Sequence, residues 1–161
     1  MGDLREAIAV LREKINEAMK AALKAQDKLK LSTLRLVNAA IKNADIELAA
    51  GKGPLADDDI LALLQKLIKQ RHDSIALYEQ GGRKELADKE RGEIEIIKAF
   101  LPQQMSDGET KAAIAAVIDE TGAAGMKDMG KVMAALKERY AGKMDFGKAS
   151  ALVKGLLTGS L

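Results

Sequence analysis

The sequence predicts an all-α protein, and three observations lead to this fold class. Aromatic side chains make up only 2% of the 161 residues while apolar ones make up 47%, so aliphatic residues and methionine must fill the core, a composition that favours packed helices. Apolar residues recur at spacings of three and four along most of the chain, which is the period of an amphipathic helix. No stretch of useful length alternates between apolar and polar residues as a half-buried strand does.

Two helices are predicted in the first fifty residues. The first begins near residue 4 and runs to about Ala25, and Asp27 is well placed to cap the second. The segment Gly51-Lys52-Gly53-Pro54 should break the second helix. The apolar faces of the two helices consist of Leu4, Ile8, Leu11, Ile15 and Met19, followed by Leu31, Leu34, Val37, Ile41, Ala44 and Leu48.

A third and a fourth helix complete an N-terminal unit. Asp57 is the predicted N-cap of the third helix, which Gly81-Gly82 closes. The fourth helix is predicted from about Arg83 to Phe100 and is stopped by Pro102, since proline disfavours helix at the residue before it. Their apolar positions are Ile60, Leu64, Leu67, Ile68, Ile75 and Tyr78, then Leu86, Ile94, Ile97 and Leu101.

Three shorter helices are predicted in the remainder of the chain. Ser106 and Glu109 have the spacing of a capping box, and Gly122 ends the helix that they start. The next helix begins near Asp128, and Asp145 caps the last one. Their apolar positions are Ile114, Val117, Ile118, Met129, Val132, Met133, Leu136, Ala149, Val153, Leu156 and Leu157.

The chain therefore divides into two predicted all-α domains. Residues 1–103 form a four-helix N-terminal unit, and residues 104–161 form a small tail of three short helices, with the joint near Pro102-Gln103-Gln104-Met105. The composition shifts at this joint, since 8 of the 14 glycines follow Ser106. A unit as small as the tail buries little surface and is only marginally stable on its own.

Composition excludes several classes of function. The chain has no cysteine and one histidine, so disulfides and Cys/His zinc sites are impossible, and we predict neither a metal site nor a cofactor. No apolar run approaches the roughly 20 residues that cross a bilayer. The start of the chain, with Asp3, Arg5 and Glu6, lacks the apolar segment of a signal peptide. These features predict a cytoplasmic protein without membrane contact.

Charge is unevenly distributed along the chain. The net charge is only +2, yet residues 127–154 hold seven bases and three acids, and residues 24–42 hold five bases and one acid. Two basic segments on a nearly neutral protein are compatible with a local nucleic-acid contact. The plainer alternative is that each segment is the solvated face of a helix.

The segment from Gly125 to Lys131 is a candidate phosphate-binding site. It matches the first seven positions of a P-loop, but Val132 replaces the magnesium-binding Ser or Thr and no strand precedes it, so we reject a nucleotide triphosphate site. A helix that starts near Asp128 would instead offer free backbone N–H groups, with Gly130 allowing close approach and Lys131 adding charge. The predicted RNA-binding residues are Lys127, Gly130, Lys131, Lys143 and Lys148.

Other chemically notable residues have structural interpretations. His72 precedes Asp73 and Ser74, but residues one and two apart on a helix do not face each other, so a triad fails and His72 is predicted to lie at the surface. The three aspartates at positions 57–59 are typical of a helix N-terminus, where the helix dipole favours negative charge. The methionines of the tail either fill its core or line an adaptable binding surface. No group of titratable residues suggests a catalytic site.

The sequence resembles the GatB/YqeY family over essentially its whole length. The most specific part is Asp128-Met129-Gly130-Lys131-Val132-Met133 in the tail. Two positions depart from the expected pattern, namely Gly92 within a helix and Phe146-Gly147 after Asp145. The other matching segments are Leu34-Arg35-Leu36-Val37, Ala40-Ile41, Gln70-Arg71, Asp73-Ser74-Ile75, Gly81-Gly82-Arg83, Leu86-Ala87, Glu90, Glu93-Ile94, Phe100-Leu101-Pro102, Gln104, Gly142, Asp145, Val153-Lys154 and Leu157.

This resemblance implies kinship with the helical and tail region of the B subunit of the glutamine-dependent tRNA amidotransferase. That region grips the body of the tRNA while other domains perform the chemistry. A label of carbon–nitrogen ligase with glutamine as amido-N-donor would describe kinship only, because the catalytic and ATP-using portions have no counterpart in 161 residues.

Three functional hypotheses follow, of which an enzyme is the least favoured, because the sequence gathers no titratable groups around a pocket. The first is a tRNA-binding module associated with aminoacyl-tRNA or amidotransferase metabolism. The second is a helical adaptor that binds a synthetase or an amidotransferase subunit, which an exposed apolar groove lined by Met126, Met129 and Met133 would favour.

Overall fold

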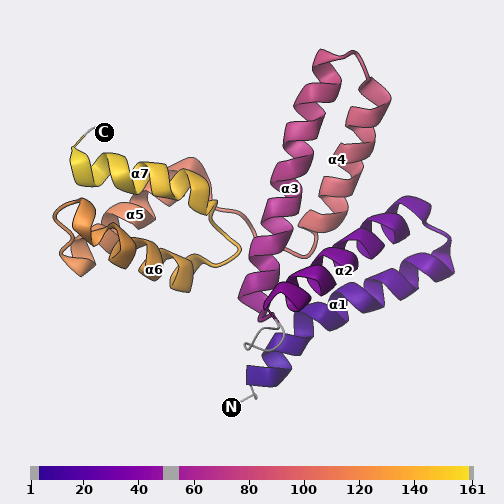
Figure 1. The fold of residues 1–161 in the computed structure, drawn as a ribbon, viewed down its shortest axis with the longest axis horizontal. Coiled ribbons are helices and arrows are strands. Elements are labelled where there is room, and N and C mark those ends of the chain that lie inside the picture. The colour runs from indigo at the N-terminus through magenta and orange to yellow at the C-terminus, as the bar shows by residue number, and fades with distance from the viewer. Residues whose placement is uncertain (1–3, 49–54, 160–161) are drawn as a thin grey trace. The chain divides into compact units, whose positions relative to one another are not determined.

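The computed structural model describes residues 4–48 and 55–159, with the side chains of residues 4–9 and 48 left out. Over these residues the protein contains seven α-helices, one short 3₁₀ helix and no strand, which confirms the all-α fold (Figure 1). The chain separates into two compact units, Met1–Leu101 and Pro102–Leu161. These are called the N-terminal and C-terminal units below, and each is described by itself.

The N-terminal unit begins with a hairpin of two long helices, α1 (Leu4–Ala25) and α2 (Lys28–Leu48). Gln26 makes the turn between them with a positive φ of 58°. The predicted cap is confirmed, because the Asp27 carboxylate accepts the backbone N–H of Lys30 at 3.1 Å. The predicted break at residues 51–54 and the side chains of Leu4, Ile8 and Leu48 lie outside the described residues.

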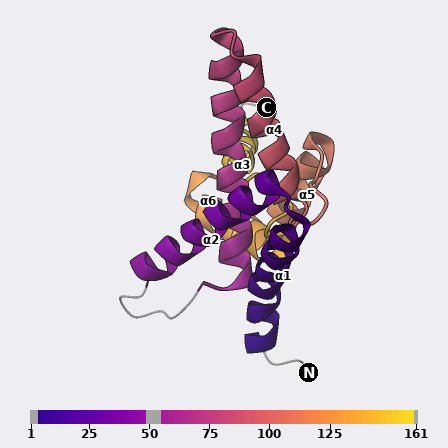
Figure 2. The same ribbon diagram turned by 90° about the vertical axis from the view of Figure 1, so that its right-hand side faces the viewer.

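A second antiparallel hairpin consists of α3 (Asp57–Gln80) and α4 (Lys84–Lys98), which run side by side in both views (Figures 1 and 2). The predicted cap of α3 was wrong by one residue. Ala56 is the N-cap, and its backbone N–H is bound by the carboxylate of Asp59 at 3.2 Å. Asp57 itself is half-buried, and burial raises the pKa of its carboxyl group.

The fourth helix is shorter than predicted. It ends at Lys98, two residues before Phe100, because the chain then turns through 3₁₀-like hydrogen bonds toward Pro102. The core of the N-terminal unit draws on all four helices. Its buried members are Leu11, Ile15, Leu34, Val37, Ile41, Leu55, Ile60, Leu64, Leu67 and Ile97, with Ile75, Ala87 and Ile94 forming a smaller cluster between α3 and α4.

The glycine inside α4 is explained by close packing. A Cβ atom built at Gly92 would lie 3.0 Å from the side-chain Cδ2 of Leu29 on α2. Real Cβ atoms are rarely found so close to another carbon, so the missing side chain lets α4 approach α2. The departure from the expected pattern at this position therefore reflects a tertiary contact that a helix pattern cannot reveal.

The C-terminal unit consists of α5 (Asp107–Thr121), the 3₁₀ helix η1 (Met126–Asp128), α6 (Met129–Tyr140) and α7 (Phe146–Thr158). The predicted caps of α5 and α7 are confirmed. The Ser106 hydroxyl accepts the N–H of Glu109 at 3.1 Å, and the Glu109 carboxylate accepts the N–H of Ser106 at the same distance. The carboxylate of Asp145 accepts the N–H groups of Gly147 and Lys148.

The core of the C-terminal unit is aliphatic. Met144 is fully buried, and Met129 and Met133 are packed against the core, so these methionines fill space, while Met126 remains 43% exposed. The groove of three methionines that would favour an adaptor is therefore reduced to one exposed side chain. The buried residues of this core are Ile114, Val117, Val132, Leu136, Met144, Ala149 and Val153.

Candidate nucleic-acid interface

The predicted phosphate site at the start of α6 differs from the sequence expectation. The 3₁₀ helix η1 runs directly into α6, so the backbone N–H of Met129 donates to the Met126 carbonyl and is not free. The carboxylate of Asp128 accepts the N–H of Ala124 at 2.9 Å. The ammonium group of Lys131 donates to the carbonyl oxygen of Thr121, also at 2.9 Å.

The contact of Lys131 has a structural role. Thr121 is the last residue of α5, where backbone carbonyls lack helical partners and the helix dipole favours a positive charge. Lys131 therefore connects α6 to the end of α5 with one of its three N–H donors. Gly130 is exposed, and a Cβ atom built there would meet nothing within 4 Å, so packing does not explain this glycine.

Two of the three remaining predicted lysines lie together at a cavity of about 650 Å³. Lys143 and Lys148 line it, and so does Lys111 of α5, which the sequence interpretation did not include. Lys127, Gly130 and Lys131 are not among its lining residues. The structure thus brings two of the five predicted residues together, with Lys111 as a third cation 32 positions before Lys143 in the sequence.

Two hydrogen bonds to backbone carbonyls fix the walls of this cavity. The backbone N–H of Met105 donates to the Lys143 carbonyl at 2.8 Å, and the side-chain Nε2 of Gln104 donates to the Gly142 carbonyl at 2.6 Å. These bonds hold the chain before α5 beside the chain before α7. Residues from the first turns of α5 and α7 line the cavity, namely Asp107, Gly108, Thr110 and Lys148, together with the cap residue Asp145.

Gly147 makes the tight cap of α7 possible. Its N–H donates to Asp145 Oδ1 at 2.9 Å, and a Cβ atom at Gly147 would lie only 3.3 Å from the same oxygen. A larger residue would push against the carboxylate that caps the helix. This contact accounts for the glycine of the unusual Phe146-Gly147 pair after Asp145, and the next residue, Lys148, lines the cavity.

The cavity combines positive charge with an apolar surface. Within residues 102–159, none of Lys111, Lys143 and Lys148 forms an ion pair, and all three are exposed. The acids Asp107 and Asp145 also line the cavity. Each lies at a helix N-terminus, where the partial positive charge of the helix offsets a carboxylate. The apolar part of the lining consists of Met105, Ala151 and Leu152.

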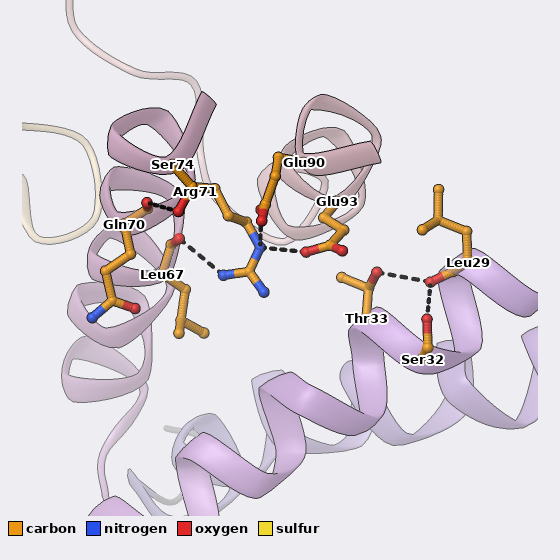
Figure 3. A network of polar contacts seen from close by, with 9 residues as sticks. All are labelled: Leu29, Ser32, Thr33, Leu67, Gln70, Arg71, Ser74, Glu90 and Glu93. Carbon is orange, nitrogen blue, oxygen red and sulfur yellow. Dashed lines mark hydrogen bonds and ion pairs between the residues drawn. The ribbon is translucent and has the colours of Figure 1, made fainter. Parts of the chain in front are cut away.

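The second polar cluster lies inside the N-terminal unit. Arg71 of α3 is only 7% exposed, and Figure 3 shows its side chain directed at two acids of α4. Its Nε atom lies 2.8 Å from Glu93 and 3.8 Å from Glu90, and its Nη1 atom donates to the Leu67 carbonyl at 3.1 Å. Burial and the neighbouring Glu93 raise the pKa of Glu90, opposed by Arg71.

This cluster connects helices and offers no open reaction site. Arg71 pairs with carboxylates that are themselves largely buried. Figure 3 also draws Thr33 of α2, whose hydroxyl donates to the Leu29 carbonyl at 2.7 Å. The sequence placed Arg71, Glu90 and Glu93 in family-like segments but gave no sign that they pair, because they lie 19 and 22 positions apart.

His72 lies at the surface, as predicted. It is exposed on α3, in a shallow hollow of about 410 Å³ that Glu79 and Arg91 also line. The hydroxyl of Ser74 donates to the Gln70 carbonyl at 3.1 Å and does not pair with the imidazole. In the part of the chain that the structure describes, no group of His, Asp and Glu side chains is arranged to hold a metal ion, and no helix is long and apolar enough to cross a membrane.

Comparison with known proteins identifies the family. The profile of the Yqey-like proteins matches residues 12–157, which is nearly the whole chain and includes both units. The chain belongs to the YqeY-like family. This family assignment agrees with the resemblance seen in the sequence and covers the capped helices of the C-terminal unit as well as the paired helices of the N-terminal unit.

Curated relatives of this YqeY-like protein come from yeasts. One from Saccharomyces cerevisiae strain YJM789 is 40% identical over 86 residues, covering 53% of this chain and 45% of the relative. One from Lachancea thermotolerans is 36% identical over 108 residues, covering 66% and 57%. One from Vanderwaltozyma polyspora is 34% identical over 87 residues, covering 54% and 46%. The chain thus spans about half the length of the curated relatives it matches.

These relatives correct the expected location. All three carry the name "Altered inheritance of mitochondria protein 41, mitochondrial", so the prediction of a cytoplasmic protein was wrong. That prediction used the lack of an apolar signal peptide and of a membrane span. Neither feature distinguishes one aqueous compartment from another, because both report only on secretion and membrane insertion.

Proposed function

We propose that this YqeY-like protein is a tRNA-binding module whose C-terminal unit contacts the RNA backbone, associated with aminoacyl-tRNA or tRNA-dependent amidotransferase metabolism. The observation that carries the proposal is the group of three exposed lysines around one cavity, none of which forms an ion pair within residues 102–159. Cations without carboxylate partners are available to replace the counterions of phosphates.

The structure changes which residues carry most of this proposal. Lys143 and Lys148 take the leading place with Lys111, because they face one hollow. Lys127 is exposed and remains a candidate for a further phosphate contact. Lys131 keeps two of its three donors for RNA but already binds the Thr121 carbonyl. The RNA contact of Gly130 stays a prediction, since the open space around this residue permits a phosphate to approach but does not require one.

Phosphate contacts alone fix the position of the protein on the RNA and carry no information about the RNA sequence. Recognition would therefore depend on RNA shape and on unpaired nucleotides, since side chains cannot read the deep groove of an A-form helix. This agrees with the kinship to the amidotransferase tail region that the sequence resemblance implies. The chemistry of an amidotransferase would belong to partner subunits, which places this chain beside the reaction as a carrier of RNA.

The test is binding of total tRNA as a function of salt, with the double variant Lys143→Glu/Lys148→Glu. We expect the wild type to show a log–log slope of about −2 to −4, for about three to five phosphates. The double variant should lose about two contacts, so its slope should become shallower by about 1.5 to 2 and its affinity should fall at least about tenfold at low salt.

The matched control is Lys137→Glu/Lys154→Glu, which makes the same change in charge at two exposed lysines of α6 and α7 that do not line the cavity. It should weaken binding much less. Absence of tRNA binding by the wild type at low salt would overturn the proposal. An association with a synthetase or amidotransferase subunit that survives nuclease and high salt, with no RNA bound, would favour the adaptor hypothesis instead.

A further inference from the structure

We propose that the cavity between α5 and α7 accepts a single unpaired nucleotide of a bound RNA, with the base against the apolar wall and its phosphates at the lysine rim. This inference rests on the proposed function and adds to it the structural class of RNA that the C-terminal unit prefers. The occupant is chosen because the cavity presents the two chemical characters of a nucleotide, an apolar surface and positive charge, side by side.

The size of the cavity permits a compact organic ligand. A volume of about 650 Å³ falls within the roughly 300–1,000 Å³ of small-molecule sites. A lysine patch that contacts only a duplex backbone needs no such depression. The wall formed by Met105, Ala151 and Leu152 is suited to the face of a base, because burying that face removes apolar surface from water.

The charges around the rim specify an anionic occupant. Lys111, Lys143 and Lys148 come from three separate parts of the chain and have no ion-pair partner within residues 102–159. The acids Asp107 and Asp145 also line the cavity, so three ammonium groups face two carboxylates and the rim keeps an excess of one positive charge. The carboxylate of Asp145 already accepts the N–H groups of Gly147 and Lys148, and Asp107 lies in the first turn of α5, where the helix dipole offsets its charge. A neutral apolar ligand would leave these ammonium groups unused, whereas a nucleotide in a strand brings a phosphate on each side of its base.

An unpaired nucleotide fits this cavity better than a paired one. Bases inside an A-form helix are stacked and cannot enter a hollow, whereas bases in loops and bulges can be turned outward at low cost. Sequence-tolerant binding is expected where the base lies on the apolar wall, because the side chains of Met105, Ala151 and Leu152 offer no N–H or oxygen atom to a base edge. The same chemistry could be supplied by a free mononucleotide, so the experiment must distinguish the two sources.

The experiment compares three blunt RNA duplexes that differ at one position in their binding to the full chain. The first is fully paired, the second carries one bulged nucleotide, and the third carries an abasic bulge with the phosphate but without the base. We expect the bulged duplex to bind about 5- to 20-fold more tightly than the paired one, by analogy with the contribution of a stacked base. The abasic bulge should bind like the paired duplex.

The variant Ala151→Trp fills the cavity from an exposed position of α7. It should abolish the preference for the bulge while leaving affinity for the paired duplex within about twofold, since backbone contacts carry that affinity. The control Ala116→Trp introduces the same side chain at an exposed position of α5 outside the cavity and should keep the preference.

The outcomes separate this inference from the proposed function. If no RNA binds at low salt, the proposed function fails and the inference fails with it. If the paired duplex binds in a lysine-dependent way but the bulge adds nothing, only the inference fails. Equal binding of the bulged and abasic duplexes would also overturn it. Tight competition by free AMP or UMP, without a preference for bulged RNA, would assign the cavity to a soluble nucleotide.

Discussion

In the N-terminal unit, arginines pair with carboxylates between helices, whereas in the C-terminal unit most lysines face solvent without such partners. Arg12 joins α1 to Asp45 of α2 at 2.7 Å, Arg71 joins α3 to α4, and Arg91 of α4 pairs with Glu79 of α3. Within residues 102–159 the one ion pair is that of Arg139 with Glu120, and it is exposed.

The difference shows how the two units use charge. The planar, forked guanidinium group suits fixed pairs with carboxylates, while the flexible ammonium group of lysine remains hydrated and available. The C-terminal unit holds together through an aliphatic core and two side-chain caps, and within residues 102–159 Lys131 is the one lysine whose ammonium group bonds to another helix. This leaves its surface free for a ligand, whereas the N-terminal unit commits its buried charges to structure.

The largest effect is expected from breaking the buried arginine cluster. Arg71→Met should destabilise the N-terminal unit by about 3–5 kcal/mol, because it leaves the carboxylates of Glu90 and Glu93 without their buried partner. Urea denaturation followed by amide hydrogen exchange would show the loss of protection confined to residues 4–101. The matched change Arg139→Met, at the exposed pair of the C-terminal unit, should have only a small effect. Equal effects of the two variants would contradict the comparison.

A medium effect with a pH signature is expected at the two acids of the cluster. Glu93→Gln should cost about 1.5–3 kcal/mol by weakening a charged hydrogen bond to Arg71. For Glu90 we expect the opposite effect of the charge on stability. Burial raises the pKa of Glu90 in the folded state, so the folded protein binds this proton more tightly, and stability falls as the pH rises from the ordinary value of 4.5 through the raised pKa.

Glu90→Gln removes that titration, so its stability relative to the wild type should increase over the same pH range. Thermal unfolding of both variants between about pH 4 and pH 8 measures the contrast. If both substitutions destabilise the protein equally at every pH, then Glu90 is as strongly paired as Glu93, and the asymmetry of the 2.8 Å and 3.8 Å contacts has no energetic meaning.

The smallest effect distinguishes two helical glycines. Gly130→Ala should stabilise the C-terminal unit by about 0.5–1 kcal/mol, because alanine is the better helix former and open space surrounds the position. Gly92→Ala should not show this gain, because its new Cβ would lie 3.0 Å from Leu29 Cδ2. Urea midpoints of the two single variants test the difference. Equal gains in stability would show that the packing of α4 against Leu29 of α2 adjusts at little cost.

The helices and their caps were predictable because their causes are local. Asp27, Ser106 and Asp145 bind backbone N–H groups two or three residues away, so residue type and spacing identify them. Small errors arose where a neighbouring element intervened. Asp57 is half-buried and Ala56 is the cap of α3. The helix predicted to begin near Asp128 does so, with Asp128 as its N-cap, but η1 precedes it and uses the backbone N–H of Met129.

The sequence by itself determined the all-α fold and most of the helix ends, because helical period and capping depend on neighbours within about one turn. It also indicated the family, through short motifs such as residues 128–133. Only the tertiary structure decided that Lys111 joins Lys143 and Lys148 at one cavity, that Lys131 binds the end of α5, and that Arg71 meets Glu93. These contacts connect residues 5 to 37 positions apart, with no spacing rule, and they form only when the packed cores fix where each helix lies.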